Sequence, residues 1–166
     1  KYDQAIEAFQ KSIDLDPDYA VRARSMGFTY SSRSELLSAI KSYERSIELD
    51  PDDAKAYAVL GIAYVIQGDL DEAIEAYQKA IDLDPDYANV YNDLGVAYRK
   101  QGRLEESIEA FQKSIDLDPG DANVYNNLFI AYDQQGKYDQ AIQAYKRAIE
   151  LKPDGAEAYI PIWMRL

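Results

Sequence analysis

Residues 54–87 read AKAYAVLGIAYVIQGDLDEAIEAYQKAIDLDPDY, and this stretch decides the fold. In its first half, apolar and small residues stand at i, i+3, i+4 and i+7, which is one face of an α-helix. These residues are Tyr57, Leu60, Gly61 and Tyr64. A second apolar stripe follows at Ala73, Ile74, Tyr77, Ala80 and Ile81. The stretch therefore predicts two amphipathic helices in succession.

The ends of these two helices are marked by residues with special backbone chemistry. Gly68 is expected to end the first helix, because only glycine enters the left-handed cap without steric cost. Asp69 is predicted as the N-cap of the second helix, with Glu72 completing a capping box. Pro85 ends the second helix, because the residue before a proline is pushed out of the helical region.

Prolines recur along the chain at one fixed interval, and they set the repeat. Pro17, Pro51, Pro85, Pro119 and Pro153 are each separated by 34 residues, as 51−17 and 85−51 show. A 34-residue period is typical of a helix-turn-helix solenoid. Aligned on the prolines, the chain predicts four full repeats at 20–53, 54–87, 88–121 and 122–155, with a partial repeat at 1–19 (second helix only) and another at 156–166 (first helix only). All six are expected to form one continuous domain.

The acidic stretch DLDPDY occurs twice, at Asp14–Tyr19 and Asp82–Tyr87, and resembles the start of a calcium loop. A calcium loop would require glycine at its sixth position, where Tyr19 and Tyr87 stand, and its fourth position here is a stiff proline. We interpret the stretch as the turn between repeats and expect no bound metal. Asp86 is then predicted to cap the next helix.

Composition excludes several classes of function. The 166 residues contain no cysteine and no histidine, so thiolate and imidazole chemistry are absent. The net charge of −12 opposes nucleic-acid binding. There is no run of about 18 apolar residues to span a membrane, no signal peptide at the start, and no phosphate-binding or dinucleotide-binding motif. We therefore expect a cytoplasmic, non-catalytic protein without cofactors, and we assign most of the 15 tyrosines, Tyr138 included, to repeat packing.

The repeat pattern resembles the tetratricopeptide repeat family across nearly the whole chain. The family's columns are met by Tyr57, Leu60, Gly61, Tyr64, Ala73, Tyr77, Ala80 and Pro85, and again in the following repeats. Phe129 replaces the close-packing glycine of the fourth repeat, and Ala23 and Ser34 depart from the pattern in the first. The resemblance implies an all-α, right-handed superhelical solenoid of antiparallel helix pairs.

The resemblance also implies a protein-interaction scaffold that binds a peptide or a partner segment in a concave groove lined by the first helices. One candidate column, Phe28, Ile62, Val96 and Ile130, would form an apolar floor. The full set of groove residues is Arg24, Phe28, Lys55, Ala58, Ile62, Val65, Asn89, Asn92, Val96, Arg99, Lys100, Asn123, Asn126, Asn127, Ile130 and Asp133. The alternative is that the apolar groups of this column serve helix packing and the rest is solvated surface.

Two features of the groove bear on its partner. Asn92, Asn126 and Asn127 can hydrogen-bond a peptide backbone, because an amide side chain both donates and accepts. One variant of the family grips a partner's C-terminal carboxylate with a clamp of Lys, Asn and Arg on successive first helices. The corresponding columns here do not carry that clamp, so the sequence does not support binding of chaperone tails.

The ends of the sequence raise a second function. The chain starts in a second helix and finishes in a first helix, so the last half-repeat of one molecule could dock on the first half-repeat of another. Candidate residues for this oligomer edge are Ala5, Phe9, Tyr159, Ile162 and Trp163. Alternatively, the chain is a fragment of a longer array, or the recruiting arm of a larger enzyme.

Overall fold

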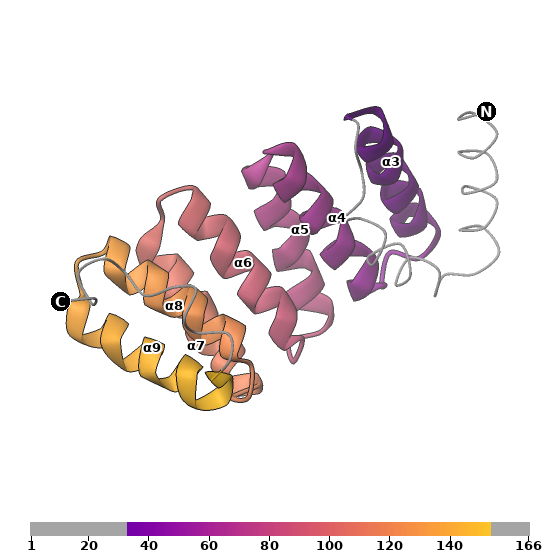
Figure 1. The fold of residues 1–166 in the computed structure, drawn as a ribbon. Helices are drawn as coiled ribbons and strands as arrows, with labels where there is room; N and C mark the ends of the chain where they lie inside the picture. The colour runs from indigo at the N-terminus through magenta and orange to yellow at the C-terminus, as the bar shows by residue number, and fades with distance from the viewer. Residues whose placement is uncertain (1–32, 154–166) are drawn as a thin grey trace. The chain divides into compact units, whose positions relative to one another are not determined.

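The computed structural model describes residues 33–153, and in this range the chain forms seven α-helices and no strand (Figure 1). The helices are α3 (Arg33–Leu49), α4 (Ala54–Gln67), α5 (Leu70–Leu83), α6 (Ala88–Lys100), α7 (Leu104–Leu117), α8 (Ala122–Gln134) and α9 (Tyr138–Leu151). The turns between them are short, so consecutive helices that pack together run antiparallel. The prediction of an all-α fold made of antiparallel helix pairs is confirmed. The chain divides into two compact units, Lys1–Asp86 and Tyr87–Leu166.

The first unit packs α4 against both α3 and α5. The apolar stripe predicted for its second helix lies inside the protein, since Ala73, Tyr77 and Ala80 are each at most 1% exposed. One core cluster of this unit is formed by Leu36, Ala39, Ile40, Tyr43, Val59, Leu60, Ala63 and Ala76. The periodicity of the sequence therefore identified the buried face of α5. On α4, Leu60 and Gly61 of the predicted stripe are buried, but Tyr57 and Tyr64 are only half-buried.

The second unit contains two helix pairs, α6 with α7 and α8 with α9, which are joined by packing of α7 on α8. Its core cluster is formed by Ile108, Phe111, Val124, Leu128, Phe129, Ala131, Tyr132, Ala141, Ala144 and Tyr145. Of the tyrosines assigned to packing, Tyr98, Tyr132 and Tyr145 are buried. Tyr138 is 56% exposed, so its assignment to the core was wrong: it is the first residue of α9 and faces solvent.

Glycine ends α4 as predicted. Gly68 takes a φ of +99° at the C-cap, where a side chain would be strained, and Gly102 and Gly136 take φ of +78° and +74° in the later turns. Asp69 is the N-cap of α5, but its carboxylate makes no capping hydrogen bond. The capping box with Glu72 was wrong, because the Asp69 backbone N–H already donates to the Tyr64 carbonyl at 3.0 Å.

The acidic turns between repeats have an internal hydrogen bond that the sequence did not reveal. The Oδ1 atoms of Asp50, Asp84 and Asp118 accept from the backbone N–H two residues further on, at 3.3, 3.3 and 3.0 Å. Each bond spans the proline, which has no N–H to offer. This arrangement explains why aspartate recurs at the C-terminal end of a helix, where the helix dipole disfavours a negative charge.

The prediction that Asp86 caps α6 was wrong by one residue. The N-cap of α6 is Tyr87, and it makes no side-chain capping bond. The aspartates one position later in the pattern do cap their helices, since Asp53 and Asp121 accept from the backbone N–H of Lys55 and Asn123, both at 2.9 Å. The capping position therefore falls in the column that holds Tyr87.

In the α4–α5 and α6–α7 pairs, a glycine in the first helix lets an aromatic ring of the second helix approach the backbone. A Cβ atom on Gly61 would lie 2.5 Å from Cε1 of Tyr77, and one on Gly95 would lie 2.6 Å from Cε1 of Phe111. In the fourth repeat Phe129 fills this column, and its ring packs beside that of Tyr145 with the centroids 5.3 Å apart. Glycine is thus required only where the ring lies directly over the helix.

Two serines connect α7 to α6 through hydrogen bonds from buried hydroxyls. Ser107 Oγ donates to the Gly95 carbonyl at 2.8 Å, and Ser114 Oγ donates to the Ala88 carbonyl at 2.9 Å. Both residues are at most 1% exposed. The other full repeats have alanine in the column of Ser107, and alanine or serine in the column of Ser114. A bonded hydroxyl makes burial of a polar group acceptable there.

Candidate functional site

The groove positions on α4 form a largely apolar face of the first unit. Ile62 and Val65 are half-buried, and Ile66, one position further, is 54% exposed. Lys55 is exposed at the start of the helix. Ala58 is only 6% exposed, so it contributes to packing and offers a partner almost no surface.

Several residues singled out in the sequence lie outside the described residues 33–153. They are the groove residues Arg24 and Phe28 and the oligomer-edge residues Ala5, Phe9, Tyr159, Ile162 and Trp163. Both functional hypotheses must therefore be built on the described helices alone.

In the second unit, α6 and α8 bring the remaining groove residues together. Asn127 Nδ2 donates to Asn92 Oδ1 at 2.9 Å, a bond between helices whose residues are 35 apart in sequence. We call the surface formed by Asn92, Val96, Arg99, Asn126, Asn127 and Ile130 the α6–α8 face; all six residues are half-buried. The neighbouring residues Asn89, Lys100 and Asn123 are exposed and Asp133 is half-buried.

The apolar residues of the α6–α8 face have two roles. Val96 and Ile130 are partly buried and pack against the core cluster of the second unit. The interpretation that this column serves helix packing is therefore correct in part, because one side of each residue contacts the core. Both residues also remain partly exposed, so part of each side chain is accessible from outside.

Two buried polar atoms of the α6–α8 face have no hydrogen-bond partner among the described residues. They are Nε of Arg99, a donor, and Oδ1 of Asn126, an acceptor. A buried group without a partner costs roughly 1–3 kcal/mol, so native proteins tolerate few of them. Burial also lowers the pKa of Arg99, because the charged guanidinium loses hydration. Sequence reasoning selected both residues by their column but could not detect their unpaired atoms.

Two further unpaired atoms lie at helix ends, away from the α6–α8 face. Oε1 of Gln67 is at the last residue of α4, and Oε1 of Gln135 is at the C-cap of α8. The Gln135 side chain is already oriented by its other end, because its Nε2 donates to Glu105 Oε1 at 2.6 Å. Neither glutamine belongs to the predicted groove residues or to the α6–α8 face.

A second surface of interest is a hollow of about 390 Å³ between α8 and α9. It is lined by Tyr125, Leu128, Tyr132, Asp139, Gln140, Gln143, Ala144 and Arg147. The preceding pair has α8 packed on α7, where Gln112 Nε2 donates to the hydroxyl of Tyr132 at 3.0 Å. Among the described residues, the lining of the hollow comes from α8 and α9 alone.

Residues 33–153 contain neither a metal-binding cluster nor a membrane-spanning helix. No group of three or more acidic side chains there could hold a metal ion. None of the helices in this part of the chain combines the length and the apolar character needed to cross a bilayer.

Sequence models of tetratricopeptide repeats match most of the chain. Those described as tetratricopeptide repeat match residues 1–19 with 25–53, residues 42–75 and residues 86–154, and one described as TPR repeat matches residues 61–102. No curated protein matches this sequence.

Solved structures of MamA are similar to this chain in fold and in sequence. One crystal structure of MamA is 33% identical with a TM-score of 0.74, and the match covers 94% of this chain and 91% of that one. A second is 32% identical with a TM-score of 0.72, over 97% and 88%. A third, described as MamA MSR-1 C2, is 32% identical with a TM-score of 0.65, over 72% and 68%. Together with the repeat matches, these similarities support a general role as a protein-interaction scaffold and point to a non-catalytic protein.

Proposed function

We propose that this chain, which belongs to the tetratricopeptide repeat family, binds an extended peptide segment of a partner protein on the α6–α8 face. The observation that carries the proposal is the pair of unpaired buried atoms, Arg99 Nε and Asn126 Oδ1. An extended peptide presents carbonyl acceptors and N–H donors along its length. A bound peptide would supply the partners that these two atoms lack.

The rest of the α6–α8 face suits such a ligand. Val96 and Ile130 offer an apolar floor for one side chain of the peptide, since both are only partly buried. The bond between Asn127 and Asn92 holds α6 and α8 together before any ligand arrives. A surface that is already ordered loses less conformational entropy on binding, so more of the contact energy appears as affinity.

Substituting Asn126 tests the proposal directly. Peptides are selected from a random 12-residue library on the immobilised chain, and their affinities are then measured by fluorescence polarisation. We expect Asn126→Ala to weaken the selected peptides about 5- to 100-fold, which corresponds to roughly 1–3 kcal/mol for a buried polar group that loses its partner. Asn123→Ala is the matched control, because Asn123 is exposed on the same helix.

Equal losses in the two variants would contradict the assignment of the site. Failure of the library to yield any binding peptide would contradict peptide recognition altogether.

A second candidate function is end-to-end assembly, which the hollow between α8 and α9 favours. The hollow has a volume of about 390 Å³ and lies beside Leu128 and Ala144. A hollow of this kind is one that a helix of a second molecule could fill. In this case we expect the molar mass from light scattering during gel filtration to rise with protein concentration. Gln143→Trp, which fills the hollow, should return it to the 18.8 kDa monomer.

Gln134→Trp is the control for this experiment, because Gln134 is exposed on α8 and does not line the hollow. A constant monomer mass over a hundredfold range of concentration would remove the assembly candidate.

A further inference from the structure

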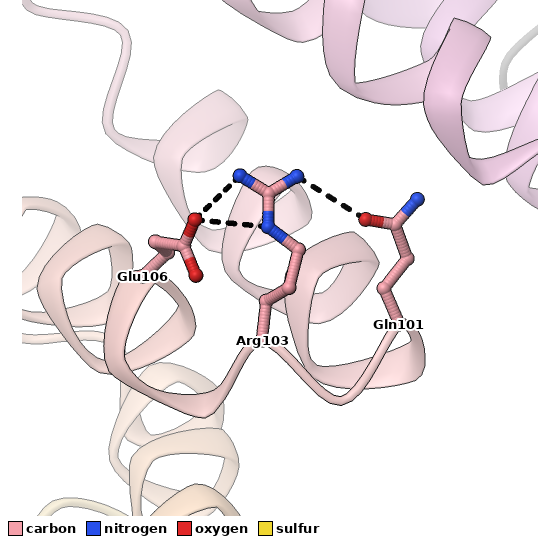
Figure 2. Close-up of polar contacts among 3 residues, drawn as sticks. All are labelled: Gln101, Arg103 and Glu106. Carbon is pink, nitrogen blue, oxygen red and sulfur yellow. Dashed lines mark hydrogen bonds and ion pairs between the residues drawn. The ribbon is translucent and has the colours of Figure 1, made fainter.

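Three arginines whose side chains the structure describes outside the α6–α8 face are each paired with a glutamate three residues further on. Arg45 contacts Glu48 at 2.7 Å and Arg147 contacts Glu150 at 2.8 Å, each three residues further on. Figure 2 shows the third example, in which the Arg103 guanidinium donates to Glu106 and also to Gln101 Oε1 at 3.3 Å. The hydrogen bond from Arg103 holds the pKa of Glu106 below its usual value. Arg99, the arginine of the α6–α8 face, is not paired in this way.

Arg99 has no acidic partner. The positions three and four residues further on are Gly102 and Arg103, so its own helix turn supplies no carboxylate. None of the ion pairs among the described side chains involves Arg99, and its Nε has no acceptor. The chain has 30 acidic residues against 18 basic ones. An unpaired, half-buried arginine in so acidic a protein indicates that its partner comes from another molecule.

The surroundings of Arg99 favour a carboxylate as that partner. The guanidinium is planar and carries a fork of N–H donors that fits both oxygens of a carboxylate. Half-burial beside Val96 strengthens such a charge-assisted bond, because less water competes for the donors. A nucleic-acid phosphate is disfavoured by the net charge of −12, whereas an acidic side chain on an otherwise apolar peptide is tolerated.

We propose that Arg99 determines the specificity of the α6–α8 face by receiving the side-chain carboxylate of an Asp or Glu in the bound peptide, with an apolar residue of the same peptide on Val96 and Ile130. This inference rests on the proposed peptide-binding function. It adds the chemical class of the partner, a peptide that carries an acidic residue next to an apolar one.

The first test uses the peptides selected from the random 12-residue library. On the wild-type chain we expect Asp or Glu to be enriched at one position. Replacing that residue by Asn or Gln should weaken binding about 10- to 100-fold, the range of one charge-assisted hydrogen-bonded pair. On Arg99→Met the acidic and amide peptides should bind within about twofold of each other. Arg45→Met loses the same charge in the first unit and should keep the full discrimination.

The outcomes separate this inference from the function on which it rests. Binding peptides without an enriched acidic position, or an Arg99→Met variant that still discriminates, would overturn the role of Arg99 and leave peptide binding intact. A library that yields no binding peptide would overturn both.

A second measurement needs no ligand. If Arg99 is kept for a partner, its buried unpaired Nε destabilises the free protein. Arg99→Met keeps the apolar stem and removes the donor, so the Tm of the free chain should rise by about 2–4 °C. Arg45→Met should leave the Tm within about 1 °C, because exposed ion pairs contribute little. A fall in the Tm of Arg99→Met would show that the guanidinium supports the fold, and would overturn the inference.

Discussion

Phe111→Ala is expected to lower the free energy of unfolding by about 3–5 kcal/mol, which is the usual cost of deleting a buried aromatic ring. Phe111 is 0% exposed and belongs to the core cluster of the second unit. Its ring lies over Gly95 of α6, so the substitution leaves a cavity between α6 and α7 that backbone atoms cannot close. Urea unfolding followed by circular dichroism measures the change.

Tyr138→Ala is the matched control for Phe111→Ala. It also deletes an aromatic ring from the second unit, but from a residue that is 56% exposed. The control should cost less than about 1 kcal/mol, since surface substitutions have small effects. A loss of similar size in both variants would contradict the central position of Phe111 in the core.

Gly95→Val is also expected to destabilise the protein, by overpacking the core where Phe111→Ala leaves a cavity. A Cβ atom at Gly95 would lie 2.6 Å from Cε1 and 2.7 Å from Cδ1 of Phe111, and Val adds two methyl groups beyond it. Overpacking of this kind costs about 1–3 kcal/mol. The gain in helix propensity from Gly to Val is only a few tenths of a kcal/mol, so the steric cost decides the sign.

The Gly95→Val prediction has an internal check and an external control. The double variant Gly95→Val with Phe111→Ala should lose less stability than the two single variants together, because the new methyl groups enter the space of the missing ring. Gly120→Val in the turn after α7 should be mild, since a Cβ there meets only the Asp118 carboxylate, at 3.3 Å. Full additivity in the double variant would show that Gly95 and Phe111 do not share this contact.

Local sequence chemistry was sufficient to predict the helices and most of their ends. The buried stripe through Ala73 and Tyr77 was predicted from helical periodicity. The end of α4 at Gly68 was predicted because glycine favours the left-handed conformation of a C-cap. Asp69 is the predicted N-cap of α5, but its capping box with Glu72 does not form, and the N-cap of α6 lies one residue after Asp86. These details depend on the backbone torsion angles of two or three residues and on which N–H groups are already bonded. A one-dimensional pattern does not contain these quantities.

The sequence predicted which residues take part in the packing between helices, but not which residues contact each other. The sequence identified Phe129 as a departure from the glycine column, yet the pairing of its ring with Tyr145 depends on the separation of α8 and α9. The hydroxyls of Ser107 and Ser114 also bond to carbonyls that lie 12 and 26 residues away. Contacts over such separations are set by the assembled fold.

The candidate site shows the same division. The helical spacing of i and i+7 placed Asn92 and Arg99 on the same face of one helix, and this followed from counting alone. The bond from Asn127 to Asn92 and the unpaired atoms of Arg99 and Asn126 emerged only from the structure, because they depend on distances between α6 and α8 and on burial. Those unpaired atoms, not the column, carry the proposed function.

The turns after α3, α5 and α7 have a consequence for the length of the chain. In each turn the side chain of Asp50, Asp84 or Asp118 accepts a hydrogen bond from the backbone N–H just beyond the proline, so the turn geometry needs no side chain from a neighbouring pair. Such joints are interchangeable: a 34-residue cassette cut at one proline and spliced in at another would meet the same turn. An array built in this way can be extended or shortened in whole steps, and only its outermost faces would have to adapt.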